Sequence, residues 1–239
     1  MTDSQRHLFL AYSTYTSDAQ TFNDWYDEVH IPQVLGAPGL THAQRFVLAD
    51  TKPLPGVNSP DLGHLAYYEL EGDPALFRNE VKRLLMSGEM VIPDFMVQPF
   101  KTLIMKPVSD VFLATGIDHY EPTADRHLFM AFSEHTGDDD TFNRWYDEVH
   151  VPQVLSAPGL VRAQRFEMAD VKPMPGVVTP ELGHLALYEL EGDALPFRSE
   201  VKRLLMSGEM VIPEFMVQPM TTMIMAPVSG VAHATAVSS

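Results

Sequence analysis

NDWYDEVHIPQVLGAPGL, residues 23–40, returns as NRWYDEVHVPQVLSAPGL at residues 143–160, 120 positions later. The repeat extends well beyond this segment, because Arg6 to Ser109 aligns without a gap to Arg126 to Ser229. Of the 104 aligned positions, 75 are identical. A period this long is that of a whole domain and not that of a solenoid repeat. The sequence therefore predicts three parts: a first copy over 1–110, a linker over 111–125 and a second copy over 126–239.

The composition restricts the class of protein. Hydrophobic residues make up 45% of the 239 positions, and 32 acidic against 16 basic side chains give a formal charge of −16. Such a field repels nucleic acid and anionic membranes. The absence of cysteine excludes a thiol nucleophile, a thiolate metal site and disulfides. No apolar run reaches the ~18–20 residues that cross a bilayer, and no secretory signal is evident. We expect a soluble, cytoplasmic protein without nucleic-acid or membrane partners.

Each copy is predicted to contain four strands and two helices. HLFLAYSTY is rich in aliphatic and aromatic residues, which is typical of a strand. Asp73-Pro74 is an N-cap followed by proline at the first helical position, and Gly88 ends that helix. The expected order in the first copy is strand 7–15, helix 18–35, strand 40–49, strand 64–71, helix 74–87 and strand 95–105.

This order predicts an α+β fold, in which two helices cover one face of an antiparallel sheet in the ferredoxin-like arrangement. The other sheet face is left bare. Burying it against a second sheet gains roughly 25 cal/mol per Å² of apolar area, and a fused copy supplies the partner at high effective concentration. We therefore expect two tandem ferredoxin-like βαββαβ domains that form an intramolecular barrel.

The motif W-Y-x-x-x-H-[IV]-P, followed by Pro-Gly and a strand, occurs at Trp25 to Pro32 and again at Trp145 to Pro152. This motif, with the order of elements, resembles the EthD-like branch of the dimeric α/β-barrel superfamily. The resemblance implies that barrel fold and a histidine pointing into the barrel. The superfamily includes cofactor-free monooxygenases, isomerases, dehydratases, lyases, haem-binding enzymes and proteins without known activity, so the resemblance does not fix a reaction.

His30 is the principal candidate for catalysis, with His150 as its copy. On an ideal helix it lies at the border of an apolar stripe formed by Phe22, Trp25, Tyr26 and Val29. Pro32 has no N–H, so the helix is expected to kink or end there. A nearby helix C-terminus favours a protonated imidazole, whereas burial opposes it. A histidine between these two effects can titrate near neutrality and move protons. The alternative is a structural histidine that caps the helix end.

Other polar residues are candidates for binding a substrate. Asn23 and Tyr26 share the side of the helix that carries His30, and Asn143 and Tyr146 are their copies. His64 and His184 open the third strand of each copy. Arg45 and Arg165 lie in mid-strand, where each is expected to pair with a carboxylate of its own domain, a substrate carboxylate being the alternative.

The differences between the copies suggest where a ligand lies. In the first strand, Leu10, Tyr12 and Thr14 differ from their counterparts, whereas the alternate positions Phe9, Ala11 and Ser13 are unchanged. We interpret the varying face as the lining of an asymmetric shared lumen; drift on a tolerant surface is the alternative. The residues predicted to line it are Tyr12, Tyr67, Met130 and Phe132.

The sequence favours an enzyme acting on a small, mostly apolar, aromatic or polyketide-like molecule. His30 and His150 would serve as acid or base in a lyase, dehydratase or isomerase step. One alternative is a cofactor-independent monooxygenase of a phenolic substrate, and another is a non-catalytic carrier of an apolar metabolite. No spacing typical of a metal site or a nucleotide loop occurs, so we expect no cofactor and no metal. The expected assembly is a monomeric pseudo-dimer or a homodimer of it.

Overall fold

The computed structural model describes residues 6–174 and 176–235. Both copies contain the predicted order of elements, with short additional strands. The first copy contains β1 (Arg6–Ser13), α1 (Ala19–Trp25), a π-helical turn η1 (Tyr26–His30), α2 (Ile31–Leu35), β2 (Leu40–Leu48), β3 (His64–Glu71), α3 (Pro74–Ser87) and β4 (Phe100–Pro107), and β5 (Phe112–Leu113) follows in the linker.

The second copy repeats this series. It contains β6 (His127–Ser133), α4 (Asp139–Trp145), the π-helical turn η2 (Tyr146–His150), α5 (Val151–Leu155), β7 (Leu160–Met168), β8 (Val177–Val178), β9 (His184–Leu190), α6 (Ala194–Ser207), β10 (Thr221–Pro227) and β11 (Ala232–His233). None of the helices in the described part of the chain has the length and apolar character needed to cross a membrane.

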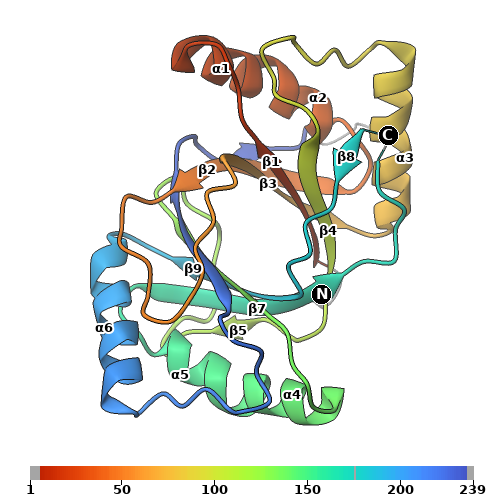
Figure 1. Ribbon diagram of the computed structural model, residues 1–239. Helices are drawn as coiled ribbons and strands as arrows, with labels where there is room; N and C mark the ends of the chain where they lie inside the picture. The colour runs from red at the N-terminus through yellow and green to blue at the C-terminus, as the bar shows by residue number, and fades with distance from the viewer. Residues whose placement is uncertain (1–5, 175, 236–239) are drawn as a thin grey trace.

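Eight strands form a closed antiparallel barrel. The strand order is β4-β1-β3-β2 in the first copy and β10-β6-β9-β7 in the second. The ring closes where β10 pairs with β2 and where β4 pairs with β7, so each join unites strands from different copies. Figure 1 shows α1 to α3 on one side of the barrel and α4 to α6 on the opposite side. The prediction of an α+β barrel is confirmed.

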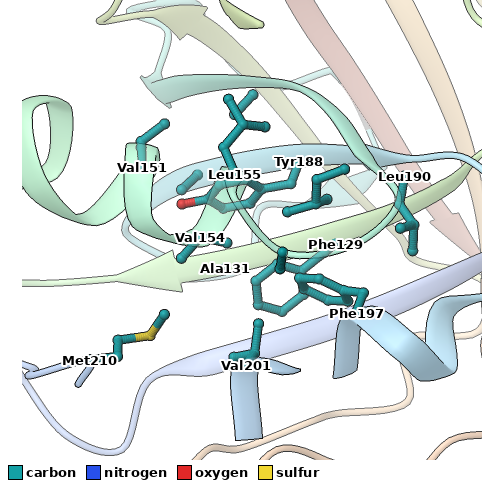
Figure 2. Close-up of a cluster of buried hydrophobic side chains, with 14 of the residues drawn as sticks. Phe129, Ala131, Val151, Val154, Leu155, Tyr188, Leu190, Phe197, Val201 and Met210 are labelled. Atoms are coloured by element: carbon teal, nitrogen blue, oxygen red, sulfur yellow. The ribbon is translucent and has the colours of Figure 1, made fainter. Parts of the chain in front are cut away.

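The hydrophobic residues form three clusters that follow from this architecture. One lies inside the barrel, and each of the other two lies between one copy's sheet and its helices. Side chains alternate across a strand, so β1 directs Leu8 and Leu10 into the barrel and Phe9 toward the helices. Figure 2 shows the helix-facing cluster of the second copy, where Phe129 packs on Phe197 with ring centroids 4.9 Å apart.

The long first helix differs from its prediction at one turn. Asp18 is the N-cap, as expected, and its carboxylate accepts a hydrogen bond from the Thr21 N–H. The helix does not end before Pro32, because η1 inserts a wider turn in which the Ile31 N–H bonds to the Tyr26 carbonyl. This turn shifts the helical phase, so Val29, predicted to be part of the apolar stripe, is exposed. The copy in η2 has the same geometry.

The second helix agrees with its sequence signals. Asp73 accepts a hydrogen bond from the Ala75 N–H, Pro74 begins the helix, and Gly88 ends it with a φ of 77°. Phe77 and Val81 form its buried face. The strand predicted over 95–105 begins later, at Phe100, just after the cis Gln98–Pro99 peptide bond.

The connecting segments cross between the copies. β5, in the linker, pairs with β7 of the second copy, whereas the C-terminal β11 pairs with β2 of the first. The long loop 170–183 also crosses, since β8 within it pairs with β4. Each copy is thus covered in part by chain from the other.

Candidate functional site

A cavity of about 300 Å³ lies between the helices and the sheet of the first copy. Its walls are mainly apolar, and its few polar groups include His30, Ser13, Gln98, Thr102 and the charged Lys82 of α3. Tyr26 and Trp25 contribute aromatic rings to the walls. The apolar side chains of the lining include Phe9, Val34, Leu85, Met90 and Phe100. A small apolar pocket with a few polar groups is the usual form of a small-molecule site.

His30 reaches this cavity from η1. The imidazole stacks on the indole of Trp25, with ring centroids 4.8 Å apart, and meets the ring of Tyr26 edge-on at 5.0 Å. Among the described residues, none provides a hydrogen-bond partner for its buried Nδ1. The prediction that this histidine points into the barrel is wrong, because the cavity lies outside the barrel wall, under the helices.

The electrostatics of His30 are set by burial. Because the helix continues past Pro32, His30 is not at a helix C-terminus, and the effect expected to favour its protonated form is absent. Removal from water lowers the pKa of His30 to about 4. Burial lowers the pKa of His150 to about 4 as well. Both rings are therefore neutral at pH 7, and a neutral imidazole has one nitrogen able to accept a proton.

The lowered pKa values predict that stability falls on acidification. An unfolded histidine takes up a proton near pH 6.5, whereas folded His150 does so only at about pH 4. The unfolded chain therefore binds more protons between these values, and the folded state loses stability as the pH falls through that window. For His150 the loss is about 3 kcal/mol by pH 4. Urea unfolding at several pH values measures it, and His150→Gln should show a shallower dependence than the unaltered chain.

Asn23 and Asn143 each accept a hydrogen bond from an arginine of the same copy. Asn23 Oδ1 accepts a hydrogen bond of 2.6 Å from Arg45, and Asn143 Oδ1 accepts one of 2.5 Å from Arg165. Arg45 also pairs with Asp27 at 2.8 Å, which confirms the predicted pairing with a carboxylate of its own domain. The guanidinium lies 4.8 Å from the centre of the Tyr26 ring. The described geometry therefore gives Asn23 a positioning role behind Tyr26.

The two tyrosines of the motif are buried side chains of this layer. Tyr26 lines the cavity, and burial raises its pKa. In the second copy the Tyr146 hydroxyl donates a hydrogen bond of 3.0 Å to the hydroxyl of Ser133. The Tyr26 hydroxyl thus stays protonated, and the Tyr26 ring forms part of the wall of the site.

His64 and His184 do not line the cavity that contains His30. His64 packs against Phe22 at 4.8 Å between ring centroids. His184 packs against Phe142 at 5.0 Å and borders a separate, open cavity beside His135. In the described residues, no group of three or more metal-ligating side chains is arranged to hold a metal ion.

The barrel interior is filled by side chains, which corrects the expectation of a ligand-binding lumen. Tyr12, Tyr67, Met130 and Phe132 do point inward, but each is at most 1% exposed and packs in the interior cluster. The Tyr67 hydroxyl donates a hydrogen bond of 2.6 Å to Glu69, and the Tyr12 hydroxyl lies 3.9 Å from Met130 Sδ. The unchanged face of β1, with Phe9, Ala11 and Ser13, borders the cavity, and Tyr12 between them is also part of its lining.

The second copy completes the site of the first. Met174, Gly176 and Val177, all from loop 170–183, line the cavity. Arg78 on α3 anchors this loop by donating hydrogen bonds of 3.1 Å to the carbonyls of Lys172 and Pro173. No pattern in the sequence indicates that this loop crosses to the other copy.

The anchoring arginine provides a prediction with a matched control. Arg78→Ala should remove the bonds to loop 170–183 and speed amide exchange at residues 176–178, by roughly tenfold if one net hydrogen bond of ~1.4 kcal/mol is lost. Arg198 makes the equivalent bonds to the carbonyls of Lys52 and Pro53. Arg198→Ala should therefore speed exchange near residue 57 and leave 176–178 unchanged. Equal exchange at 176–178 in Arg78→Ala and the unaltered chain would contradict the anchoring role.

No protein-family model matches the sequence, and no curated protein matches it. Solved structures do share the fold. A putative monooxygenase from Fusobacterium nucleatum has a TM-score of 0.56 and 12% sequence identity, over 97% of this chain and 95% of that one. An anthrone oxidase-like protein has a TM-score of 0.57 and 10% identity, over 98% and 96%. At these identities the likenesses show a shared fold.

Proposed function

We propose that the protein is an enzyme that binds a small aromatic molecule in the first-copy cavity and oxidises it with O₂, without a cofactor. The observation that supports this function best is a neutral, mostly buried imidazole, His30, on the wall of an apolar cavity. The names of the two structures with the same fold favour oxidation over the lyase or dehydratase step first expected. His150, its copy, is also neutral, but it is 7% exposed and is not part of the lining of this cavity.

The proposed reaction begins with proton removal. His30 takes the proton of a phenolic hydroxyl, and the apolar walls leave the resulting phenolate poorly solvated and electron-rich. The phenolate reduces O₂, and the new C–O bond forms at the ring carbon opposite the oxygen. That carbon loses its hydrogen as the peroxide breaks. One oxygen atom of O₂ becomes a carbonyl, the other leaves as water, and the phenol becomes a quinone; His30 returns the first proton to that water.

An oxygen electrode tests the proposal. We expect the protein to accelerate O₂ uptake by 1-naphthol or by anthrone, with one O₂ consumed for each quinone formed, above the rate without protein. Chelator-treated protein should be equally active. Quinone formation without O₂ uptake, or no acceleration with either probe, would count against the oxidation.

The acid–base reaction first expected is a second candidate, because the same unpartnered imidazole would serve a lyase, dehydratase or isomerase. It predicts turnover of an aromatic substrate under nitrogen at the rate seen in air. A carrier is the remaining alternative and predicts binding of the probes with no turnover in either gas.

We also propose that the chain is a tandem pair of ferredoxin-like domains of the EthD-like branch, joined by the segment 111–125. The support is the strand order, which runs β4-β1-β3-β2 in one copy and β10-β6-β9-β7 in the other. The copies of the W-Y-x-x-x-H-[IV]-P motif lie on equivalent turns, η1 and η2.

A further inference from the structure

The two copies do not expose their equivalent sites equally. His30 is partly exposed to the cavity, whereas His150 is buried with 7% exposure. Ala11 is partly exposed, and its counterpart Ala131 is 4% exposed. These positions belong to different elements, a π-helical turn and a strand, so the difference is not local to one side chain.

The helix above the site differs at one neighbouring position. Leu84 on α3, next to the cavity-lining Leu85, is partly exposed, whereas its counterpart Leu204 on α6 is buried and belongs to the second copy's hydrophobic cluster. Figure 2 shows this layer, with Ala131 on its strand among Phe129, Val154 and Val201. At these three positions the side chains of the second copy are less exposed than those of the first.

The crossing loops differ at the positions that meet each site. The first copy's cavity is covered by Met174, and the second copy's cluster contains Leu54 at the equivalent position. The strand wall differs as well, since Phe100 lines the cavity and Met220 replaces it against the second cluster. An aromatic wall and a flexible thioether are both suited to contact with a flat ring.

We propose that each chain binds one planar aromatic ligand of naphthol size, in the first-copy cavity only. The second copy contributes loop 170–183 to the wall of that site. Its own equivalent site is filled by side chains and binds no ligand. His30, and not His150, is then the histidine that meets the ligand. This inference rests on the proposed function for the class of ligand, but it concerns binding, and its test requires no turnover.

Calorimetric titration of the whole chain with 1-naphthol provides the test. We expect one equivalent to bind per chain. Ala11→Leu, which places a larger side chain in the cavity, should weaken binding at least tenfold, and the matched Ala131→Leu should change it less than twofold. A second pair, Leu85→Trp and Leu205→Trp, repeats the comparison at partly exposed positions of α3 and α6. Melting curves of all four variants are the control for correct folding.

The two tryptophans of the chain report on the two sites separately, because Trp25 stacks on His30 and Trp145 on His150. In the Trp145→Phe chain, 1-naphthol should quench the remaining fluorescence, and adding Ala11→Leu should abolish that quenching. Two bound equivalents, equal weakening by both members of a pair, or no binding to the unaltered chain would overturn the proposal. Failure of the oxidation itself would leave a single equivalent and the Ala11–Ala131 difference intact.

Discussion

Replacement of His30 by glutamine is expected to lower turnover by at least 100-fold while changing the dissociation constant of 1-naphthol by less than threefold. The reason is that general base catalysis contributes about 10²–10⁴ to a rate, whereas an apolar cavity binds mainly through its walls. Glutamine keeps hydrogen-bonding capacity but cannot take a proton. The measurement is O₂ uptake with saturating probe, together with calorimetric titration of the same variant.

His150→Gln is the matched control, because both histidines stack on a tryptophan and both have a pKa lowered to about 4 by burial. A single site in the first copy predicts turnover within about twofold of the unaltered chain for His150→Gln. Similar rates in His30→Gln and the unaltered chain would remove His30 from the proposed mechanism. A weakened affinity with an unchanged rate would instead assign it to binding alone.

The pH dependence of the unaltered chain follows from the same burial. The imidazole of free His30 becomes protonated only as the pH falls to about 4, so turnover per bound substrate should be constant from pH 8 to pH 5.5 and should decline below that. An acid limb near pH 6.5 would indicate a His30 that is accessible to water.

The sequence predicted those elements of the fold that depend on interactions between residues close together in the chain. The Asp73 cap, Pro74 and Gly88 defined a helix because each acts within one turn of the chain. The repeat predicted a barrel of two copies, since a duplicated sheet needs a partner for its bare face. A carboxylate partner for Arg45 within its own domain was also predictable, because a mid-strand charge requires a nearby counter-charge; that the partner is Asp27 was not predicted.

The site was harder to predict because its position depends on long-range packing. Alternation along β1 separates two faces, but it does not reveal which face is filled and which borders a cavity. An ideal helical period placed Val29 inside, since the wider turn η1 carries no signal in the residues alone. Gln98, Thr102 and Met174 were missed. Only the proline after Gln98 marked that segment as unusual, and Met174 comes from the opposite copy.

A network of buried charges inside the barrel fixes the two copies relative to each other. Glu189 is 1% exposed and binds Arg126 at 2.6 Å, Arg162 at 2.5 Å and Arg6 of the first copy at 3.2 Å. Arg162 also reaches Glu69 of the first copy at 3.1 Å. Burial opposes ionisation of Glu189, yet these arginines hold its pKa below the ordinary value. The carboxylate is thus charged and shared by three guanidinium groups.

Glu189→Gln is expected to destabilise the chain by at least about 3 kcal/mol, because it leaves buried arginines without their counter-charge. The amide nearly preserves the shape of the side chain, so the loss measures charge rather than packing. The matched control is Glu200→Gln, which removes an exposed pair with Arg203 and should cost less than about 1 kcal/mol. Urea unfolding of both variants at pH 7, followed by circular dichroism, gives the two free energies. If Glu189→Gln lost no more stability than Glu200→Gln, the charge network would not fix the two copies relative to each other. The strand pairing of β10 with β2 and of β4 with β7 would then do so alone.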